Sequence, residues 1–530
     1  MKSTIKNIVV LAILATTSAG CNKDLNEVVY SDVTEQTYTY ENANAAMGIV
    51  YANMRNLFGH TNYYMVQETT SDELVMPANP SGWDDGGIFK RMHQHTWNSE
   101  NPQLINMWNS MYQGVINSNR IIEQIQNNRV PVPPGTTKTA LLAEMRSARA
   151  FFYWLICDNF GAAPLITTTS TDLPGKASRR DIYNFIVGDL QAAIPDLSDV
   201  TGKAMHGRFN KWAAKALLAN VYLNAQVYTG EEKWSECQAQ CEEIIISGKY
   251  QLEGDYRNSF KTQNENSPET VFAVPFDENR GGGFFPDMFS WHAALRDKFA
   301  MQSTPWGAGS AMGVPQFIDT YDAGDKRLGY TWMMGAQFAA DGVTPLKGSY
   351  DMAGKNLVFT RELPNGLFTG EAEGYRMNKF EVRSGARFDL SNDFPFFRYA
   401  QVLLMKAECL ARKGDAAGAA QIVTSVRARN FDDPSQATVT GSGLLADSRY
   451  QYGFVENYKI VDRDNTAPVK LGRLLDELGW EFAWEGHRRR DDVRFGVFTT
   501  KSWLSKKPQG TDRSVFMIPQ TAINSNPKLK

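Results

Sequence analysis

Paired segments of helical periodicity, separated by short glycine-containing breaks, limit the folds open to this chain of 530 residues. Apolar side chains recur at helical spacing in residues 212–228 and 234–246, with Gly230 between the two stretches. Residues 397–412 and 415–429 repeat this arrangement around a second glycine. Interleaved alanines let such helices pack closely, as they do in tetratricopeptide repeats. We therefore expect a mainly α-helical, tetratricopeptide-like helical-repeat scaffold.

The rest of the chain divides into further helices and long irregular segments. Helical spacing also marks residues 41–58, 103–126 and 138–159. Residues 250–394 are rich in Gly, Pro, Asn, Asp and aromatic residues, with short strand-like runs such as 270–274 and 357–360, and residues 59–102 have a similar character. We expect one body over 41–530, with its scaffold at about 41–249 and 395–530 and an irregular ligand-binding insertion at about 250–394. Long loops on a rigid frame commonly carry binding sites.

The first residues have the pattern of a secretion signal. Lys2 and Lys6 precede the apolar run 8–15, and small residues lead into Cys21. This run is too short for a membrane-spanning helix, and no later stretch approaches the roughly 18 apolar residues that one needs. We interpret residues 1–20 as a signal peptide, Cys21 as a lipidation site similar to that of bacterial lipoproteins, and 21–40 as a linker. A plain signal peptide with an incidental cysteine is the alternative.

Composition and motifs argue against several functional classes. A net charge of −3 does not supply the basic surface that non-specific nucleic-acid binding requires. No nucleophile elbow, H-E-x-x-H motif or P-loop is present, and His93 and His95 have no further ligands at metal-site spacing. Cys237 and Cys241, four residues apart, could meet, but buried free thiols are the simpler interpretation. We expect no catalytic residue, no metal and no cofactor.

Four segments in chain order carry a more specific signal. They are residues 148–166 (ARAFFYWLICDNFGAAPLI), 395–409 (PFFRYAQVLLMKAEC), 474–496 (LLDELGWEFAWEGHRRRDDVRFG) and 516–527 (FMIPQTAINSNP). Together with the N-terminal cysteine they resemble the SusD/RagB family of outer-membrane lipoproteins. The chain departs from the family pattern at Gln401, Val493, Phe495, Met517 and Ala522. Within the third segment, we expect Glu481 and Glu485 on one helical face, with Arg488 and Asp491 in the next turn. Such charges predict ion pairs that hold the C-terminal segment on the frame.

The resemblance implies a function. It implies a glycan-binding lipoprotein of the cell outer membrane that faces the cell surface, captures oligosaccharides and delivers them to a SusC-like TonB-dependent transporter. It implies neither a cofactor nor catalysis. Capture of peptides, as by a RagB-like import lipoprotein, is an alternative. A surface glycanase and an adaptor that touches no glycan are others.

Candidate binding residues lie in the irregular segments, where the family builds its ligand sites. Sugars present apolar C–H faces and a rim of hydroxyl groups, so their sites combine flat aromatic rings with polar side chains. One candidate group is Trp83 with Asp72, Asp84 and Asp85, in a stretch rich in turn-forming residues. A second group lies within the insertion and consists of Trp291, Trp306, Tyr330 and Trp332.

Overall fold

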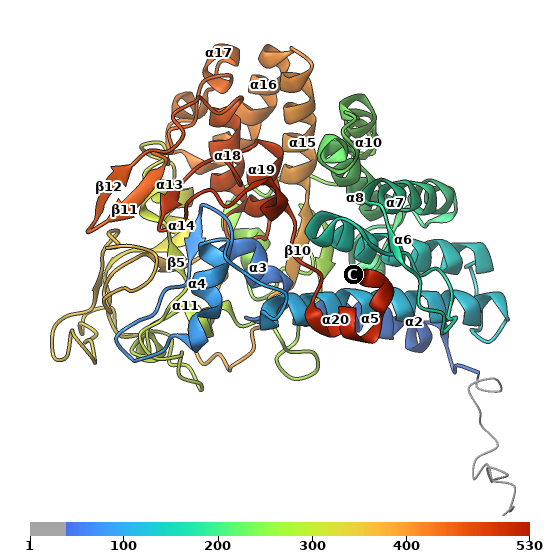
Figure 1. The fold of residues 1–530 in the computed structure, drawn as a ribbon, viewed down its shortest axis with the longest axis horizontal. Helices are drawn as coiled ribbons and strands as arrows, with labels where there is room; N and C mark the ends of the chain where they lie inside the picture. Colours follow the sequence, from blue (N-terminus) through green and yellow to red (C-terminus); the bar gives the residue numbers. More distant parts are fainter. Residues whose placement is uncertain (1–38) are drawn as a thin grey trace, which may run out of the picture.

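The computed structural model describes residues 39–530 (Figure 1). The predicted signal peptide and Cys21 lie outside these residues. The longer helices are α2 (Ala43–Arg55), α5 (Pro102–Gln126), α6 (Lys138–Phe160), α7 (Arg179–Ala193), α8 (Lys211–Leu223), α10 (Trp234–Ile246), α15 (Tyr399–Arg412), α16 (Ala416–Arg427) and α18 (Gly472–Phe482). The shorter helices are α3 (Tyr63–Thr69), α4 (Ile88–His93), α9 (Ala225–Thr229), α11 (Pro286–Ser290), α12 (Leu295–Lys298), α13 (Pro315–Ile318), α14 (Arg327–Thr331), α17 (Gly441–Leu444), α19 (Arg488–Arg494) and α20 (Gln520–Ser525).

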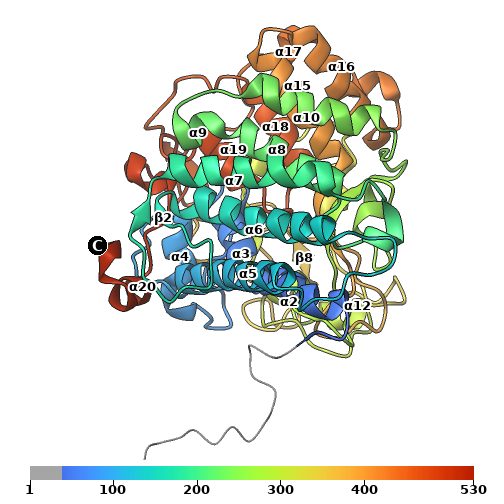
Figure 2. The same ribbon diagram turned by 90° about the vertical axis from the view of Figure 1, so that its right-hand side faces the viewer.

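The helical scaffold is a stack in which each long helix packs on the next. The order of neighbours is α2, α5, α6, α7, α8, α10, α15 and α16 (Figure 2). The irregular segments gather at the opposite side of the molecule, on the left in Figure 1. The predicted mainly α-helical, tetratricopeptide-like scaffold is therefore confirmed, and each of the predicted helices is present within a few residues of its expected ends.

Local sequence signals explain where the helices begin and end. The side chains of Thr137 and Asn210 accept hydrogen bonds from backbone N–H groups at the starts of α6 and α8. Ser178 and Asp181 form a reciprocal capping box on α7, a helix that was not among those predicted. The predicted helix 212–228 is interrupted at Asn224, so that α9 follows α8 as a separate short helix.

Strands are few and short, as predicted. Strand β4 (Thr270–Val274) pairs antiparallel with β10 (Phe394–Arg398), and β11 (Gly453–Glu456) lies between β12 (Lys459–Asp462) and β13 (Trp503–Leu504). The remaining pairs are β1 (Leu74–Val75) with β5 (Met312–Gly313), β2 (Ala163–Pro164) with β3 (Lys176–Ala177), β6 (Trp332–Met333) with β9 (Arg376–Met377), and β7 (Gly335–Ala336) with β8 (Val358–Phe359). Because β10 leads directly into α15, its pairing with β4 joins both ends of the irregular segment to the scaffold.

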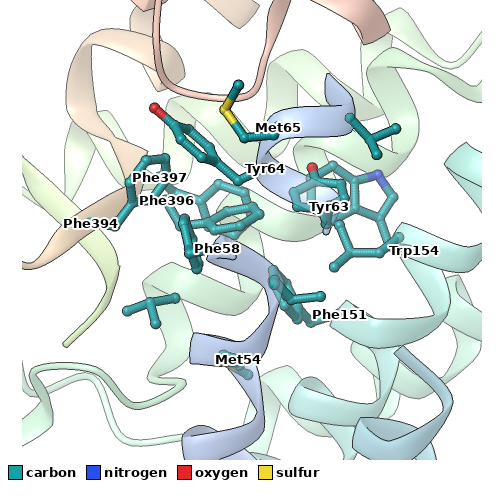
Figure 3. Close-up of a cluster of buried hydrophobic side chains, with 14 of the residues drawn as sticks. Met54, Phe58, Tyr63, Tyr64, Met65, Phe151, Trp154, Phe394, Phe396 and Phe397 are labelled. Carbon is teal, nitrogen blue, oxygen red and sulfur yellow. The ribbon is translucent and has the colours of Figure 1, made fainter. Parts of the chain in front are cut away.

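An aromatic cluster joins the scaffold to this strand pair. Figure 3 shows rings from the N-terminal segment, α6 and β10 packed together. The ring centroids of Phe58 and Phe394 are 4.5 Å apart, and those of Phe151 and Phe396 are 4.9 Å apart. Each of these side chains is at most 5% exposed. Burial of rings from segments so distant in sequence contributes to stability roughly in proportion to the apolar area removed from water.

The C-terminal motif folds differently from the expected helical face. Helix α18 ends at Phe482, and Trp484 adopts a left-handed conformation with φ of 66°. Glu485 therefore lies beyond the helix that carries Glu481. Both carboxylates still bind one side chain, Arg398, so the expected ion pairs form although the expected geometry was wrong.

The four cysteines within residues 39–530 form no disulfide bonds. Cys157, Cys237, Cys241 and Cys409 are buried free thiols, as the simpler interpretation predicted. Within the same residues, none of the helices has the length and apolar character needed to cross a bilayer.

Candidate ligand-binding site

An open pocket of about 240 Å³ brings together two of the predicted tryptophans. Its lining consists of Met76, Ser81, Trp83, Phe289, Trp306, Gly307, Ser310 and Tyr350. These residues come from three separate stretches of chain: before α4, from α11 into the segment that follows α12, and in the loop between β7 and β8. Aromatic rings alternate in this lining with hydroxyl groups, which suits a ligand with both apolar faces and hydroxyl groups.

Trp83 stands on a tight turn that is held by Asn79. The backbone N–H of Gly82 donates to the carbonyl of Asn79 at 3.0 Å, and the N–H of Asn79 donates to the carbonyl of Trp83 at 3.3 Å. Gly82 has φ of 83°, a conformation that favours glycine. The half-buried indole packs against Phe89 of α4, with ring centroids 5.6 Å apart. The turn thus presents one part of the indole to the pocket.

Trp306 is supported by aromatic neighbours and remains 37% exposed. Its indole meets His60 edge-on at 5.1 Å, and Phe388 and Phe285 lie 5.8 Å and 5.9 Å away. Its backbone N–H donates to the carbonyl of Met288 in α11 at 2.7 Å. Because these neighbours hold the indole while more than a third of the residue stays exposed, Trp306 can offer ring surface to a ligand.

Asn79 also connects the two walls of the pocket. Its side-chain amide donates to the carbonyl of Gly309 at 3.2 Å and to the hydroxyl of Ser310 at 2.5 Å. Its carbonyl oxygen accepts from the hydroxyl of Ser81 at 2.5 Å. Asn79 is only 2% exposed, so these bonds are shielded from water. The turn of Trp83 and the loop of Trp306 are therefore fastened together before any ligand arrives.

Tyr350 is the exposed lining residue that sequence reasoning missed. Its side chain is 44% exposed. It lies in a stretch flanked by Gly348, Asp351 and Gly354, the same mixture of turn-forming and acidic residues that surrounds Trp83. That local composition is the signal that could have identified it.

The two predicted aspartates next to Trp83 lie outside the pocket lining. Asp84 forms an ion pair with Lys90 at 2.6 Å. Asp85 is exposed and begins a short 3₁₀ turn (Asp85–Gly87) with φ of 48°. Neither aspartate contributes to the eight-residue lining.

The prediction that Asp72 binds a ligand was wrong, because this residue is part of the buried structure. Its side chain is fully buried, and its carboxylate accepts from Nε of Arg488 at 2.6 Å and from the hydroxyl of Tyr452 at 3.0 Å. A carboxylate with these partners holds the segment after α18 in place and presents nothing to a ligand. The sequence could not separate it from Asp84, because its partner is more than 400 positions away.

Trp291 and Trp332 also need correction. Each is 1% exposed. The indole N–H of Trp291 donates to the carbonyl of Met377 at 2.7 Å, and that of Trp332 donates to the hydroxyl of Tyr321 at 3.2 Å. Both are core residues with satisfied polar groups. Tyr330 is half-buried away from this pocket, with the guanidinium of Arg257 4.5 Å from its ring centroid.

His60 beside the site and His93 in α4 are neutral packing residues. Burial lowers the pKa of His60, against an opposing effect of Asp85, so the support under Trp306 is uncharged at neutral pH. Burial also lowers the pKa of His93 to about 3. Within residues 39–530 no group of three or more His, Cys, Asp or Glu side chains is arranged to hold a metal ion.

Two larger hollows offer a poorer combination of groups. One of about 360 Å³, between α5, α20 and the 164–174 segment, is lined largely by apolar side chains such as Ile116 and Leu173. Another of about 570 Å³ contains Arg427 and Arg473, and both guanidinium groups are already paired with Asp322. The pocket of Trp83 and Trp306 combines two partly exposed indoles with the hydroxyl groups of Ser81, Ser310 and Tyr350.

Comparison with known proteins identifies the fold family. The model of the SusD family matches residues 216–530, and a model described as "Starch-binding associating with outer membrane" matches residues 23–223. SusD-like protein P25 of Formosa agariphila is 23% identical over 519 residues, which cover 93% of this chain and 90% of that protein. Starch-binding protein SusD of Bacteroides thetaiotaomicron is 27% identical over 427 residues, covering 72% of this chain and 71% of that protein.

A solved structure agrees with these matches. Surface glycan-binding protein A from Bacteroides fluxus superimposes with a TM-score of 0.65 at 20% identity, covering 92% of this chain and 97% of that chain. The two family models together span almost the whole sequence, and the helical architecture is shared. The resemblance seen in the four sequence motifs is thereby confirmed, and the chain belongs to the SusD family.

Proposed function

We propose that this protein binds glycans at the outer membrane and captures oligosaccharides at the cell surface through the pocket of Trp83 and Trp306. The relatives carry names that describe starch binding and surface glycan binding, and one family model refers to association with the outer membrane. These names support the class of ligand.

The observation that carries the proposal is the convergence of Trp83 and Trp306, more than 200 residues apart, on one open pocket. Stacking of a sugar ring on an indole buries apolar C–H groups, and the hydroxyl groups of Tyr350 and Ser81 can form hydrogen bonds with the hydroxyl groups at the sugar's rim. Such shallow, hydrated sites gain modest affinity, because water competes for each polar contact.

The delivery step forms the second part of the proposal. Lipidation of Cys21 would hold the body at the outer membrane, and a SusC-like TonB-dependent transporter would receive the captured glycan. This step draws its support from family membership. Replacing Cys21 by alanine should release the protein from the outer-membrane fraction; retention of the variant in that fraction would contradict the anchor.

The lining of the pocket favours binding over hydrolysis. Glycoside hydrolysis ordinarily requires two carboxyl groups that face each other across the scissile bond. The part of the chain that the structure describes contributes no carboxylate to the lining of this pocket. A peptide ligand, which the resemblance also allows, would contact the same aromatic rings but would not require the hydroxyl groups that line the pocket.

A binding screen tests the proposal. Purified protein is run by affinity electrophoresis against starch, β-glucans, fructans, hemicelluloses and host glycans, and the products are analysed in the same samples. We expect retardation by one glycan class without released oligosaccharides. Retardation by none of the glycans, together with binding to peptides, would contradict the proposal, and released products would establish a glycanase instead.

A further inference from the structure

The loop that carries Tyr350 is held by one buried carboxylate. Glu371 is fully buried, and its side chain accepts hydrogen bonds from the backbone N–H groups of Ser349 at 2.6 Å, Tyr350 at 2.9 Å and Met352 at 3.2 Å. In return, the backbone N–H of Glu371 donates to the carboxylate of Asp351 at 3.2 Å. Bonds between a charged acceptor and backbone donors are among the stronger ones in proteins. One side chain thus fixes the conformation of residues 349–352.

The same carboxylate also contacts the floor of the Trp306 loop through His292. Nε2 of His292 meets Oε1 of Glu371 in a buried pair. The N–H of Ala294 donates to Nδ1 of His292 at 3.0 Å, so Nδ1 is an acceptor and the imidazole proton lies on Nε2, facing Glu371. The next residue, Ala293, donates its N–H to the carbonyl of Gly307 at 2.8 Å. Glu371 therefore connects the Tyr350 loop to the loop of Trp306.

The chain just before Glu371 reaches the third wall of the pocket. The N–H of Ala78 donates to the carbonyl of Leu367 at 3.1 Å, and the N–H of Thr369 donates to the carbonyl of Ala78 at 3.0 Å. Ala78 precedes the turn of Trp83. A single stretch, residues 367–371, is thus bonded to all three segments that line the pocket.

We propose that Glu371 is a positioning residue, which sets the place of Tyr350 relative to Trp306 and so shapes the glycan site; this inference rests on the proposed function. The hydroxyl of Tyr350 lies 4.0 Å from the position that a Cβ on Gly307 would occupy, so the ring lies close beside the Trp306 loop. Glu371 itself cannot touch a ligand, because its side chain has no exposed surface. Its effect on binding must pass through the loop that it holds.

The charge states of the pair fit this role. Burial raises the pKa of Glu371, but hydrogen bonds from Ser349, Tyr350 and His292 outweigh it and hold the pKa below its ordinary value. Burial lowers the pKa of His292, so the imidazole is neutral at pH 7. The charge of the Glu371 carboxylate is therefore stabilised by four hydrogen-bond donors, one of them the neutral imidazole of His292. Each carboxylate oxygen accepts from two of these donors, so an amide in place of the carboxylate would turn its NH₂ group toward two donors.

Glu371→Gln tests the inference, with Asp341→Asn as the matched control. Asp341 is an exposed carboxylate in the same loop that accepts the N–H groups of Val343 and Thr344, outside the pocket. Amide hydrogen exchange at residues 349–352 should accelerate about tenfold in Glu371→Gln and stay unchanged in Asp341→Asn. Unchanged exchange in Glu371→Gln would overturn the inference, whatever the ligand proves to be.

Glycan affinity, measured with and without Tyr350→Ala, distinguishes a positioning role of Glu371 from a general effect on stability. Glu371→Gln should weaken binding of the glycan found in the screen about five- to tenfold, and less than about twofold when Tyr350→Ala is already present. Equal effects in both backgrounds would show that Glu371 does not act through Tyr350. If wild-type protein binds no glycan, the proposed function fails while the exchange experiment still decides the role of Glu371. His292→Leu, which removes one donor and leaves the three backbone bonds, should give a smaller acceleration and serves if Glu371→Gln does not fold.

Discussion

Arg398 and Glu485 form a buried two-point ion pair between segments 87 residues apart. Nε of Arg398 donates to one carboxylate oxygen at 2.6 Å, and Nη2 donates to the other at 2.8 Å. Both side chains are 1% exposed. Lys379 also donates to Glu485, at 2.5 Å. The pair fastens the segment after α18 to the junction of β10 and α15, which is where the irregular segment meets the scaffold.

Glu485→Gln should therefore destabilise the fold strongly. Removing this charge leaves Arg398 and Lys379 buried with less compensation, and breaking a buried ion pair typically costs about 3–5 kcal/mol. The measurement is the free energy of unfolding from urea denaturation. Glu362→Gln is the matched control, because its pair with Arg361 is exposed and should contribute less than about 1 kcal/mol. Equal losses in the two variants would contradict this account.

Acid should weaken the same network through Glu481. Burial raises the pKa of Glu481, but Arg429, Arg398 and Arg327 outweigh it and lower the pKa from 4.5 to about 2. A carboxyl group with a lowered folded-state pKa stabilises the fold above its unfolded pKa, and that contribution disappears as the pH falls from 4.5 toward 2. The loss attributable to Glu481 is about 3 kcal/mol.

Urea denaturation of wild type and Glu481→Gln at several pH values checks the sign. The variant is less stable at pH 7, and the difference between the two proteins should shrink as the pH falls through this window. A difference that stays constant from pH 7 to pH 2 would contradict the assignment.

Replacement of glycine by alanine should have opposite effects on stability at two helical positions, one crowded and one open. A Cβ added to Gly114 in α5 would lie 2.4 Å from the ring of Phe152 in α6. Gly114→Ala should therefore destabilise the protein by about 1–3 kcal/mol through overpacking. A Cβ on Gly188 in α7 meets nothing within 4 Å, so Gly188→Ala should raise stability by up to about 1 kcal/mol through helix propensity.

Thermal unfolding of both variants measures this contrast. Phe152→Leu in the Gly114→Ala background should recover part of the loss, because it removes the ring that the new methyl group meets. No change with Gly114→Ala would contradict the described packing of α5 on α6, and destabilisation by Gly188→Ala would contradict the open space beside Gly188 in α7.

The scaffold was predictable because its signals are local. Apolar periodicity, alanines and the glycine after α9 lie within single helices or hairpins, and these elements form where the sequence indicates. Helix α7 was missed although its buried residues Ile182, Ile186 and Leu190 recur at helical spacing and its capping box, Ser178 with Asp181, was a further usable signal. The end of α18 at Phe482 could not be read locally, because the conformation of Trp484 depends on distant partners such as Tyr64, which donates to its carbonyl at 2.9 Å.

The site was predictable only in part. Trp83 and Trp306 line the pocket, whereas Trp291 and Trp332 occur in similar irregular surroundings yet are buried. The indole N–H groups of Trp291 and Trp332 donate to a carbonyl and a hydroxyl group from elsewhere in the chain. Local composition does not reveal such partners. Tyr350 was missed although the residues around it, such as Gly348 and Asp351, resemble those around Trp83.

The central claim is that Trp83 and Trp306 together bind the glycan. The most direct measurement is calorimetric titration of the glycan found in the screen into wild type, Trp83→Ala, Trp306→Ala and a control, Trp234→Ala, whose half-buried indole packs against Arg412 in the scaffold. Each pocket variant should bind at least about tenfold more weakly, because loss of one stacking ring removes on the order of 1–2 kcal/mol, while its melting temperature stays within a few degrees of wild type. Wild-type affinity in both pocket variants would contradict the account.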